Sequence, residues 1–159
     1  MMNISIGYLN DYPNFIPLIA QWHLKQWHHI LSSYTIDRYV QLLSYHYQRG
    51  GIPTMFVALN NNTVVGTAAF DDYDMDTHTE LSPWLASVYV YEKYRKKGVG
   101  KALVRRVIEE AFATKSEKLY LFTSNQVSFY KRFGWITMFR EKYYGEEENV
   151  MVLNIPPKP

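Results

Sequence analysis

The stretch 95–100 (Arg-Lys-Lys-Gly-Val-Gly) joins two segments whose hydrophobic patterns differ. Before it, residues 84–91 form a short apolar run rich in β-branched and aromatic side chains, which predicts a buried strand. After it, Val99, Leu103 and Val107 recur at helical spacing, and this pattern predicts an amphipathic helix. The chain must therefore place a strand, a glycine-containing turn and the start of a helix in succession.

Such a turn can hold an anion. The N–H groups of the turn and of the first helical turn have no intrahelical acceptor, and they lie at the positive end of the helix dipole. Gly98 and Gly100 carry no Cβ, so that a phosphate can approach the backbone closely. Positive charge is added around the same point by Arg95, Lys96, Lys97 and Lys101. We interpret the stretch as a pyrophosphate cradle.

Two common nucleotide motifs do not fit this cradle. A Walker loop needs a Gly that precedes its Gly-Lys pair by four intervening residues and a Ser or Thr after the pair. Around Gly100-Lys101 these positions hold Arg95 and Ala102. The dinucleotide fingerprint needs a third Gly where Leu103 stands. From these residues alone, a capped surface helix with solvated lysines remains the alternative.

Length and composition set the wider limits. The 159 residues suit one domain, which we expect to span 1–159 with a core at 3–155 and an extended tail at 156–159. Charge is nearly balanced, 17 basic against 15 acidic residues, so we expect no nucleic-acid or membrane partner. The absence of Cys excludes disulfides and thiol chemistry. No secretory signal or membrane-spanning run is visible, and a cytoplasmic protein is expected.

Periodicity and turn residues predict the remaining elements. The expected strands are 3–9, 54–59, 63–70, 118–122, 136–144 and 150–155, and the further helices are 15–31, 35–49 and 126–133. Residues 145–148 are expected to form the last hairpin turn. This order predicts an α/β (α+β) fold, a mixed sheet of about six to seven strands flanked by about four helices.

Two clusters of polar residues have both a structural and a functional interpretation. His23, His28, His29 and His46 lack a metal-ligand spacing, so we expect ordinary helix histidines and no metal site. The acidic loop 71–80 fails as a calcium loop, because Thr77 and Pro83 stand where Gly and Glu are required. This loop is either a solvated loop or an acidic rim that attracts a cationic acceptor and supplies a carboxylate base.

The order of elements and two local motifs resemble the GCN5-related N-acetyltransferase (GNAT) family over about residues 3–155. The first motif is Val88-Tyr89-Val90 followed by 95–100, which is similar to the family's Arg/Gln-x-x-Gly-x-Gly/Ala signature for acyl-CoA. The second is 128–135 (Ser-Phe-Tyr-Lys-Arg-Phe-Gly-Trp), which resembles the family's late Phe-Tyr-x-x-x-Gly-Phe/Trp segment. Residues 74–84 also resemble a bacterial subgroup whose acceptors are mostly unassigned.

The resemblance implies a mostly antiparallel sheet with a bulged central strand that splays from its neighbour. It also implies an acetyl-CoA site in which backbone groups of the central strand bind the pantetheine amides. The N–H groups from Lys96 to Lys101 would hold the pyrophosphate. The implied cofactor-binding residues are Val88, Tyr89, Val90, Arg95, Lys96, Lys97, Gly98, Val99, Gly100 and Lys101.

The resemblance further places Tyr130 at the position of the general acid. An alkyl thiol titrates near ~8.5 and Tyr near ~10, so a tyrosine hydroxyl can protonate the departing CoA thiolate. Glu80, with Asp76 and His78 as alternatives, is the candidate general base. The chain departs from many relatives at Lys96, where they have Gly, and at Thr123, where they have Asn; Asn125 is nearby and is a candidate to serve the cofactor instead.

The resulting hypothesis is direct acetyl transfer from acetyl-CoA to a primary amine of a small molecule or peptide. A non-catalytic acyl-CoA-binding or sensing module is the second hypothesis. Nucleic-acid binding through the basic residues of 95–106 is the third, and it predicts steeply salt-dependent binding. Homodimers are common in the family.

Overall fold

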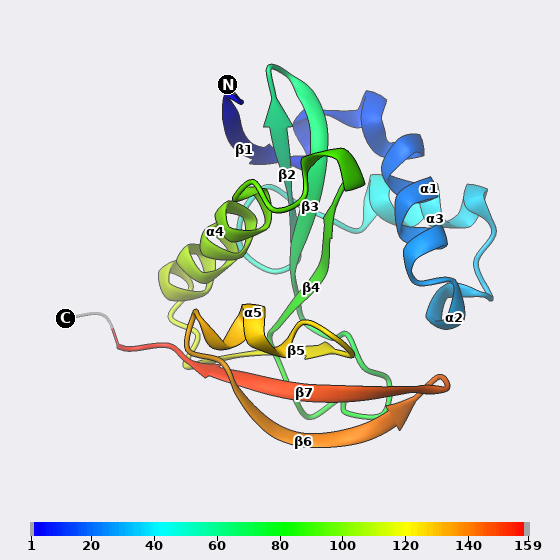
Figure 1. Cartoon of the computed structure of the whole chain (residues 1–159). Coiled ribbons are helices and arrows are strands. Elements are labelled where there is room, and N and C mark those ends of the chain that lie inside the picture. The colour runs from blue at the N-terminus through cyan, green and yellow to red at the C-terminus, as the bar shows by residue number, and fades with distance from the viewer. Residues whose placement is uncertain (1, 158–159) are drawn as a thin grey trace.

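The computed structural model describes residues 2–157, and the last two residues of the expected tail lie outside that range. Seven strands form one sheet in the order β1-β2-β3-β4-β5-β7-β6 (Figure 1). They are β1 (Ile4–Tyr8), β2 (Thr54–Asn60), β3 (Thr63–Asp71), β4 (Trp84–Val90), β5 (Lys118–Thr123), β6 (Ile136–Tyr143) and β7 (Glu146–Asn154). All neighbours are antiparallel except β4 and β5, which are parallel. The predicted mixed, mostly antiparallel sheet is confirmed.

The helices lie on both faces of this sheet (Figure 1). They are α1 (Ile16–Gln26), α2 (His28–Leu31), α3 (Ile36–Tyr45), α4 (Val99–Ala113) and α5 (Val127–Lys131), with 3-10 turns at Leu9–Asp11, Pro13–Phe15 and Glu92–Tyr94. One face of the first strands is covered by α1 and α3, and α4 packs against the other. The sheet is thus the middle layer of three.

The alternation of side chains along β2 builds both layers of the core. Phe56 and Ala58 pack toward α4, whereas Met55, Val57 and Leu59 pack toward α1 and α3. Strand residues point alternately to opposite faces, so a strand buried on both sides is apolar throughout. A third cluster, around Trp84 and Tyr143, joins the loop 72–83 to β5, β6 and β7.

The largest differences between the observed and the expected element boundaries occur in three places. The helix expected at 15–31 breaks at Trp27, whose ψ of 36° is not helical. The helix expected at 35–49 ends at Tyr45, although its predicted cap is confirmed, because Thr35 accepts a hydrogen bond from the N–H of Arg38 at 3.2 Å. The turn expected at 145–148 is shorter, because β7 already begins at Glu146.

Candidate active site

The site is created where β4 leaves β5. The two strands pair only at Trp84 and Tyr120 within residues 2–157. On its other side, β4 carries an extra residue against β3, because Thr67 pairs with Tyr89 while Ala69 pairs with Ala86. Ser87 lies in this bulge and has a φ of +53°. A bulge bends its strand, so β4 diverges from β5 after Trp84, and the expected splayed pair of central strands is confirmed.

A cleft of about 440 Å³ lies at this divergence. Its walls come from four parts of the chain that are far apart in the sequence. They are residues 26–31 with Tyr39, residues 85–88 of β4, residues 121–126 with Tyr130, and the acidic residues Asp74, Glu146 and Glu148. The cleft therefore reaches both the α1–α2 side and the α5 side of the sheet.

The turn before α4 has the backbone geometry of an anion cradle. Lys96 and Gly98 have positive φ values of 59° and 86°, and Gly98 is the N-cap residue of α4. The first helical hydrogen bond runs from the N–H of Ala102 to the carbonyl of Gly98 at 3.1 Å. The N–H groups between these two residues therefore lack intrahelical acceptors. Arg95 donates from Nε to the carbonyl of Val90 at 2.8 Å, which ties the turn to the end of β4.

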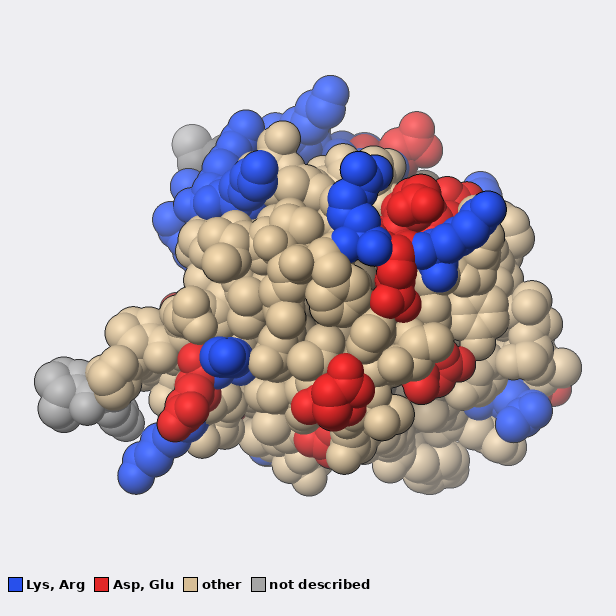
Figure 2. Space-filling view, turned by 90° about the horizontal axis from the view of Figure 1, so that it is seen from below, with Lys and Arg blue, Asp and Glu red and all other residues tan. Residues whose placement is uncertain are grey.

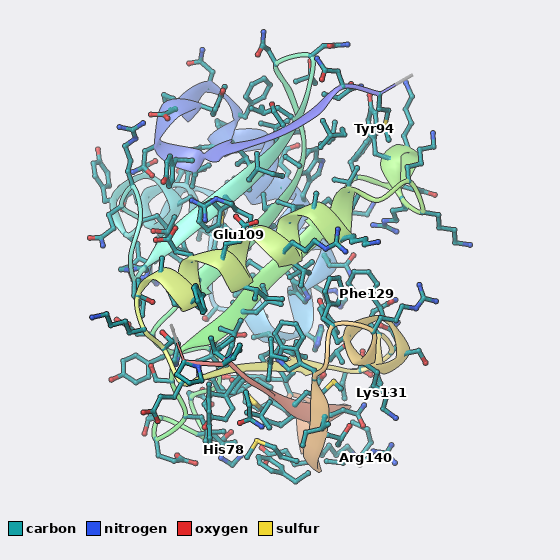
Figure 3. The ribbon with its side chains drawn as sticks, turned by 90° about the vertical axis from the view of Figure 1, so that its left-hand side faces the viewer. His78, Tyr94, Glu109, Phe129, Lys131 and Arg140 are labelled. Carbon is teal, nitrogen blue, oxygen red and sulfur yellow. The ribbon has the colours of Figure 1, made fainter. Side chains whose placement is uncertain are left out.

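The start of α4 also lies beside α5. A Cβ added at Gly100 would lie 3.6 Å from the Phe129 ring and 3.7 Å from a methyl group of Val90. In Figure 3, α4 crosses the sheet, and Phe129 lies below its N-terminal half. The turn at 95–100, the end of β4 and the helix that carries Tyr130 are thus adjacent.

Tyr130 is packed among other aromatic side chains in the wall of the cleft. It is 7% exposed, and its ring makes edge contacts with Phe129 and Trp135. Trp135 in turn donates from its indole nitrogen to the carbonyl of Leu119 at 3.1 Å. Burial raises the pKa of Tyr130 above its usual range. Its hydroxyl therefore stays protonated at neutral pH, the state that a proton donor needs.

The remaining predicted cofactor residues lie in different environments. Val88 and Asn125 line the cleft with Tyr130. Tyr89 lies outside it, with its ring stacked on Trp22 at 5.3 Å between centroids. Arg95, Lys96, Lys97, Gly98, Val99, Gly100 and Lys101 also lie outside the cleft, in the turn and first turn of α4.

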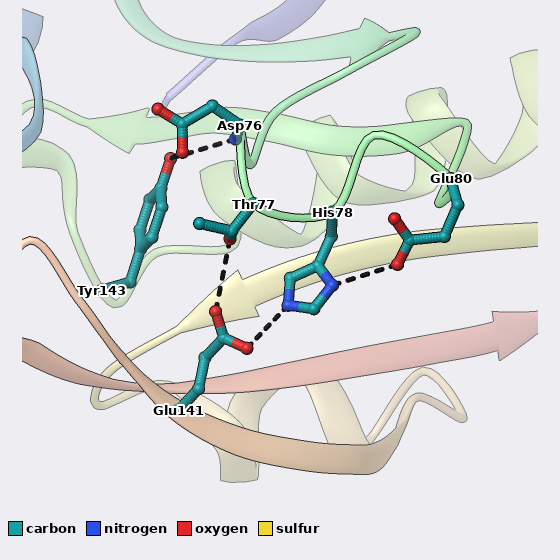
Figure 4. Close-up of polar contacts among 6 residues, drawn as sticks. All are labelled: Asp76, Thr77, His78, Glu80, Glu141 and Tyr143. Atoms are coloured by element: carbon teal, nitrogen blue, oxygen red, sulfur yellow. Dashed lines mark hydrogen bonds and ion pairs between the residues drawn. The ribbon is translucent and has the colours of Figure 1, made fainter.

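Glu80 is not brought to this cleft. Its Oε1 lies 3.0 Å from Nδ1 of His78, and Nε2 of His78 lies 2.6 Å from Oε1 of Glu141 on β6 (Figure 4). His78 is at the opposite end of the molecule from Tyr94, which precedes the turn at 95–100 (Figure 3). Asp76 instead bonds Tyr143 and Tyr144 at 3.2 and 3.0 Å. These contacts fasten the loop 72–83 to β6.

The cleft has an acidic end that the sequence analysis only partly anticipated. Asp74, Glu146 and Glu148 line it, and no Lys or Arg does so among the described residues. Burial raises the pKa of Glu148 to about 7, and the charge of Glu146 adds to this effect. Burial also raises the pKa of Asp74, with further contributions from Asp71 and Glu148.

This acidity is local. On the face formed by β6 and β7, acidic side chains gather in separate patches among uncharged surface, with basic side chains nearby (Figure 2). Asp71, the first residue of the expected acidic loop, is buried at the end of β3, where it accepts a hydrogen bond from Tyr47 at 3.1 Å. Asp74 is therefore the member of the predicted acidic rim that reaches the cleft.

A buried hydrogen-bond chain supports the bulge. Thr67 donates from Oγ1 to the carbonyl of Ser87 at 2.8 Å, so it must accept from Nε2 of His23, 2.9 Å away. Nδ1 of His23 then accepts from the hydroxyl of Tyr39 at 2.8 Å. Burial lowers the pKa of His23 to about 3, so the ring is neutral at physiological pH. Of the four histidines considered for metal binding, His23 thus has a structural role.

Residues 2–157 contain no group of three or more His, Asp or Glu side chains placed to hold a metal ion. Over the same range, no helix is long and apolar enough to cross a membrane.

Comparison with known proteins identifies the family. The Acetyltransferase (GNAT) family profile matches residues 16–135, about three quarters of the chain. The protein belongs to this family, whose members transfer acetyl groups. No curated protein matches the chain significantly.

Solved structures share the fold over nearly the whole chain. YncA from Salmonella typhimurium, solved with its cofactor acetyl-CoA, is 17% identical over 99% of this chain and 96% of its own, with a TM-score of 0.72. The ribosomal-protein-S18-alanine N-acetyltransferase from Escherichia coli is 18% identical over 99% and 97%, with a TM-score of 0.71. Ard1 from Thermoplasma volcanium is 17% identical over 96% and 98%, with a TM-score of 0.74. At these identities the likeness supports the fold alone.

Proposed function

We propose that the protein is an N-acetyltransferase that moves the acetyl group of acetyl-CoA directly to a primary amine of a small molecule or peptide. The observation that carries this proposal is the position of Tyr130 in the wall of the cleft that opens between β4 and β5. Family membership supports acetyl transfer in general. The acetyl donor is acetyl-CoA, the cofactor of the Salmonella structure that shares this fold.

The proposed binding mode follows the exposed backbone. Beyond Trp84, the edge of β4 that faces β5 is unpaired, so we expect the peptide groups of Val88 and the N–H of Val90 to bind the pantetheine amides, while the carbonyl of Val90 accepts from Arg95. The turn at 95–100 then receives the pyrophosphate on the N–H groups before Ala102. Lys96, Lys97 and Lys101 supply positive charge around it.

The proposed reaction places Tyr130 beside the leaving group. The amine attacks the thioester carbonyl carbon, the new C–N bond forms, and the C–S bond breaks. The departing thiolate takes the proton of the Tyr130 hydroxyl. In this reaction, an N–H of the β4 edge near Val90 stabilises the oxyanion of the intermediate. The acidic end of the cleft favours an acceptor that arrives as a cation.

A thermal-shift titration with acetyl-CoA, CoA and ATP tests the donor site. Stabilisation by both CoA compounds and not by ATP is expected, because ligands that bind the folded state raise its stability. A panel of primary amines with thiol detection then tests turnover. Since the chain has no Cys, a thiol reagent reports only released CoA. Binding without turnover on any amine would favour a non-catalytic acyl-CoA-binding module.

A further inference from the structure

We infer that Glu148 is the general base of the reaction, the group that takes a proton from the ammonium form of the acceptor. This inference rests on the proposed function, because it assumes an amine acceptor in the cleft. The sequence-based candidate for this role, Glu80, is exposed and held by His78 outside the cleft.

The first argument is the unmet hydrogen-bonding capacity of the side chain. Glu148 is only 4% exposed, and its buried Oε2 has no hydrogen-bond partner among the described residues. An unpaired buried carboxylate oxygen costs free energy, so such a group calls for a ligand that completes it. Because Glu148 lines the cleft that holds Tyr130, its carboxylate group is adjacent to the space that an ammonium group of the acceptor would occupy.

The second argument is the arrangement of charges around it. Asp74 on the loop after β3 and Glu146 on β7 line the same cleft. Glu141, its cross-strand partner on β6, is bound to His78, and the histidines of the cleft are His28 and His29 of α2. No Lys or Arg among the described residues enters the cleft, so its carboxylates lack a fixed counter-ion. A cationic acceptor provides one.

The third argument concerns the proton that must leave. A primary ammonium titrates near ~10.4, so at neutral pH nearly all of the acceptor is protonated and cannot attack. Burial and Glu146 raise the pKa of Glu148 to about 7, which suits a base that works near neutral pH. The ammonium proton passes to the carboxylate group of Glu148, and the freed lone pair forms the C–N bond. The second proton of the adduct nitrogen returns through solvent to Tyr130, which gave its own proton to the thiolate.

Glu148→Gln tests the inference, and Glu147→Gln is the matched control. Glu147 is the neighbouring strand residue, is exposed and lies outside the cleft. Turnover is measured with 1,5-diaminopentane, spermidine, a lysine-containing peptide and a peptide with a free amino-terminal alanine. With an accepted amine, Glu148→Gln should lower kcat/KM at pH 7.5 by roughly 100-fold or more. Its affinity for acetyl-CoA should match that of the wild type, and Glu147→Gln should change neither quantity.

The pH profile separates a base from a structural carboxylate. Wild-type kcat/KM should rise as the pH increases through about 7, where Glu148 becomes ionised. The deficit of Glu148→Gln should shrink as the pH approaches ~10, because the amine then loses its proton without help. A deficit that stays constant with pH, or no deficit, would overturn the role of Glu148 while leaving the acetyltransferase assignment intact. Absence of turnover by the wild type on every amine would overturn both.

Discussion

Trp84 on β4 and Tyr120 on β5 are the one pair of residues that joins these two strands within the described chain. Both side chains are buried, and their rings lie 5.8 Å apart between centroids. The pair therefore acts as the point from which the strands diverge. Everything proposed for the site depends on this divergence, because it opens the cleft and leaves the edge of β4 free for a ligand.

The role of Tyr130 predicts a kinetic result. Tyr130→Phe should lower kcat by roughly 100-fold or more and leave the affinity for acetyl-CoA nearly unchanged, because only the transferable proton is lost. Tyr120→Phe is the control, since Tyr120 is also buried but lies outside the cleft. Steady-state thiol release and calorimetric titration measure the two quantities. Unchanged turnover of Tyr130→Phe would show that another group protonates the thiolate.

The cradle predicts that two glycines respond differently to the same change. Gly98 and Gly145 have φ values of 86° and 85°, and a Cβ at either position meets no atom within 4 Å. Replacement by alanine should therefore lower the free energy of unfolding by a similar amount at each position, about 1 kcal/mol, because a left-handed backbone conformation strains any residue that has a Cβ.

Only Gly98→Ala should also weaken acetyl-CoA binding, by roughly tenfold, which corresponds to about 1.4 kcal/mol. Chemical unfolding and calorimetric titration of both variants measure these effects. Equal acetyl-CoA affinity in the two variants would mean that the pyrophosphate is bound elsewhere.

The buried His23 predicts a pH dependence of stability. Its pKa is about 3 in the folded protein and near ~6.5 in the unfolded chain, so between these values the unfolded state binds more protons. The contribution of neutral His23 to the stability of the folded protein should thus be complete above about pH 6.5 and be lost as the pH falls toward 3. The free energy of unfolding of the wild type minus that of His23→Gln, measured at pH 5 and pH 7.5, should be larger at pH 7.5. A difference independent of pH would contradict a neutral buried ring.

The stability that His78 contributes should depend on pH in the opposite direction to that of His23. Hydrogen bonds to Glu141 and Glu80 raise its pKa in the folded state. These contacts should stabilise the protein fully below the unfolded value near ~6.5 and lose their effect as the pH rises through the folded pKa.

His78→Gln should therefore lower the free energy of unfolding more at pH 6 than at pH 9, and urea unfolding at the two pH values measures this. His28→Gln should lower the free energy of unfolding little at either pH, because His28 is exposed and its contacts are weak, a 3.4 Å hydrogen bond with the carbonyl of Lys25 and an edge contact with the ring of His29. A larger cost of His78→Gln at pH 9 than at pH 6 would contradict the charged pair.

Local sequence patterns predicted much of the fold. The apolar run at 84–91, the glycines at 98 and 100 and the helical spacing after them describe features within one segment, and the structure contains the expected strand, turn and helix there. The strands expected at 54–59 and 63–70 form a hairpin, and the residues Asn60, Asn61 and Asn62 between them favour a turn for the same reason, because turn residues act locally.

Tertiary contacts decide what the local patterns could not. Glu146, Glu147 and Glu148 have the composition of a turn, but pairing with β6 draws them into β7. Val150 and Val152 are two residues apart and therefore point to the same face of the strand. Extending this spacing by two more residues would have placed Glu148 on that face as well. Its burial could not have been foreseen, because the loop that carries Asp74 and the helices that complete the cleft come from distant parts of the chain.

Amine-dependent release of free thiol from acetyl-CoA, followed at pH 7.5 with the four-amine panel, tests the central claim most directly. The account predicts thiol release with at least one cationic amine, a matching acetylated product by mass spectrometry, and loss of that release in Tyr130→Phe. Acetyl-CoA binding without thiol release on any amine, or release that is the same in Tyr130→Phe, would contradict it.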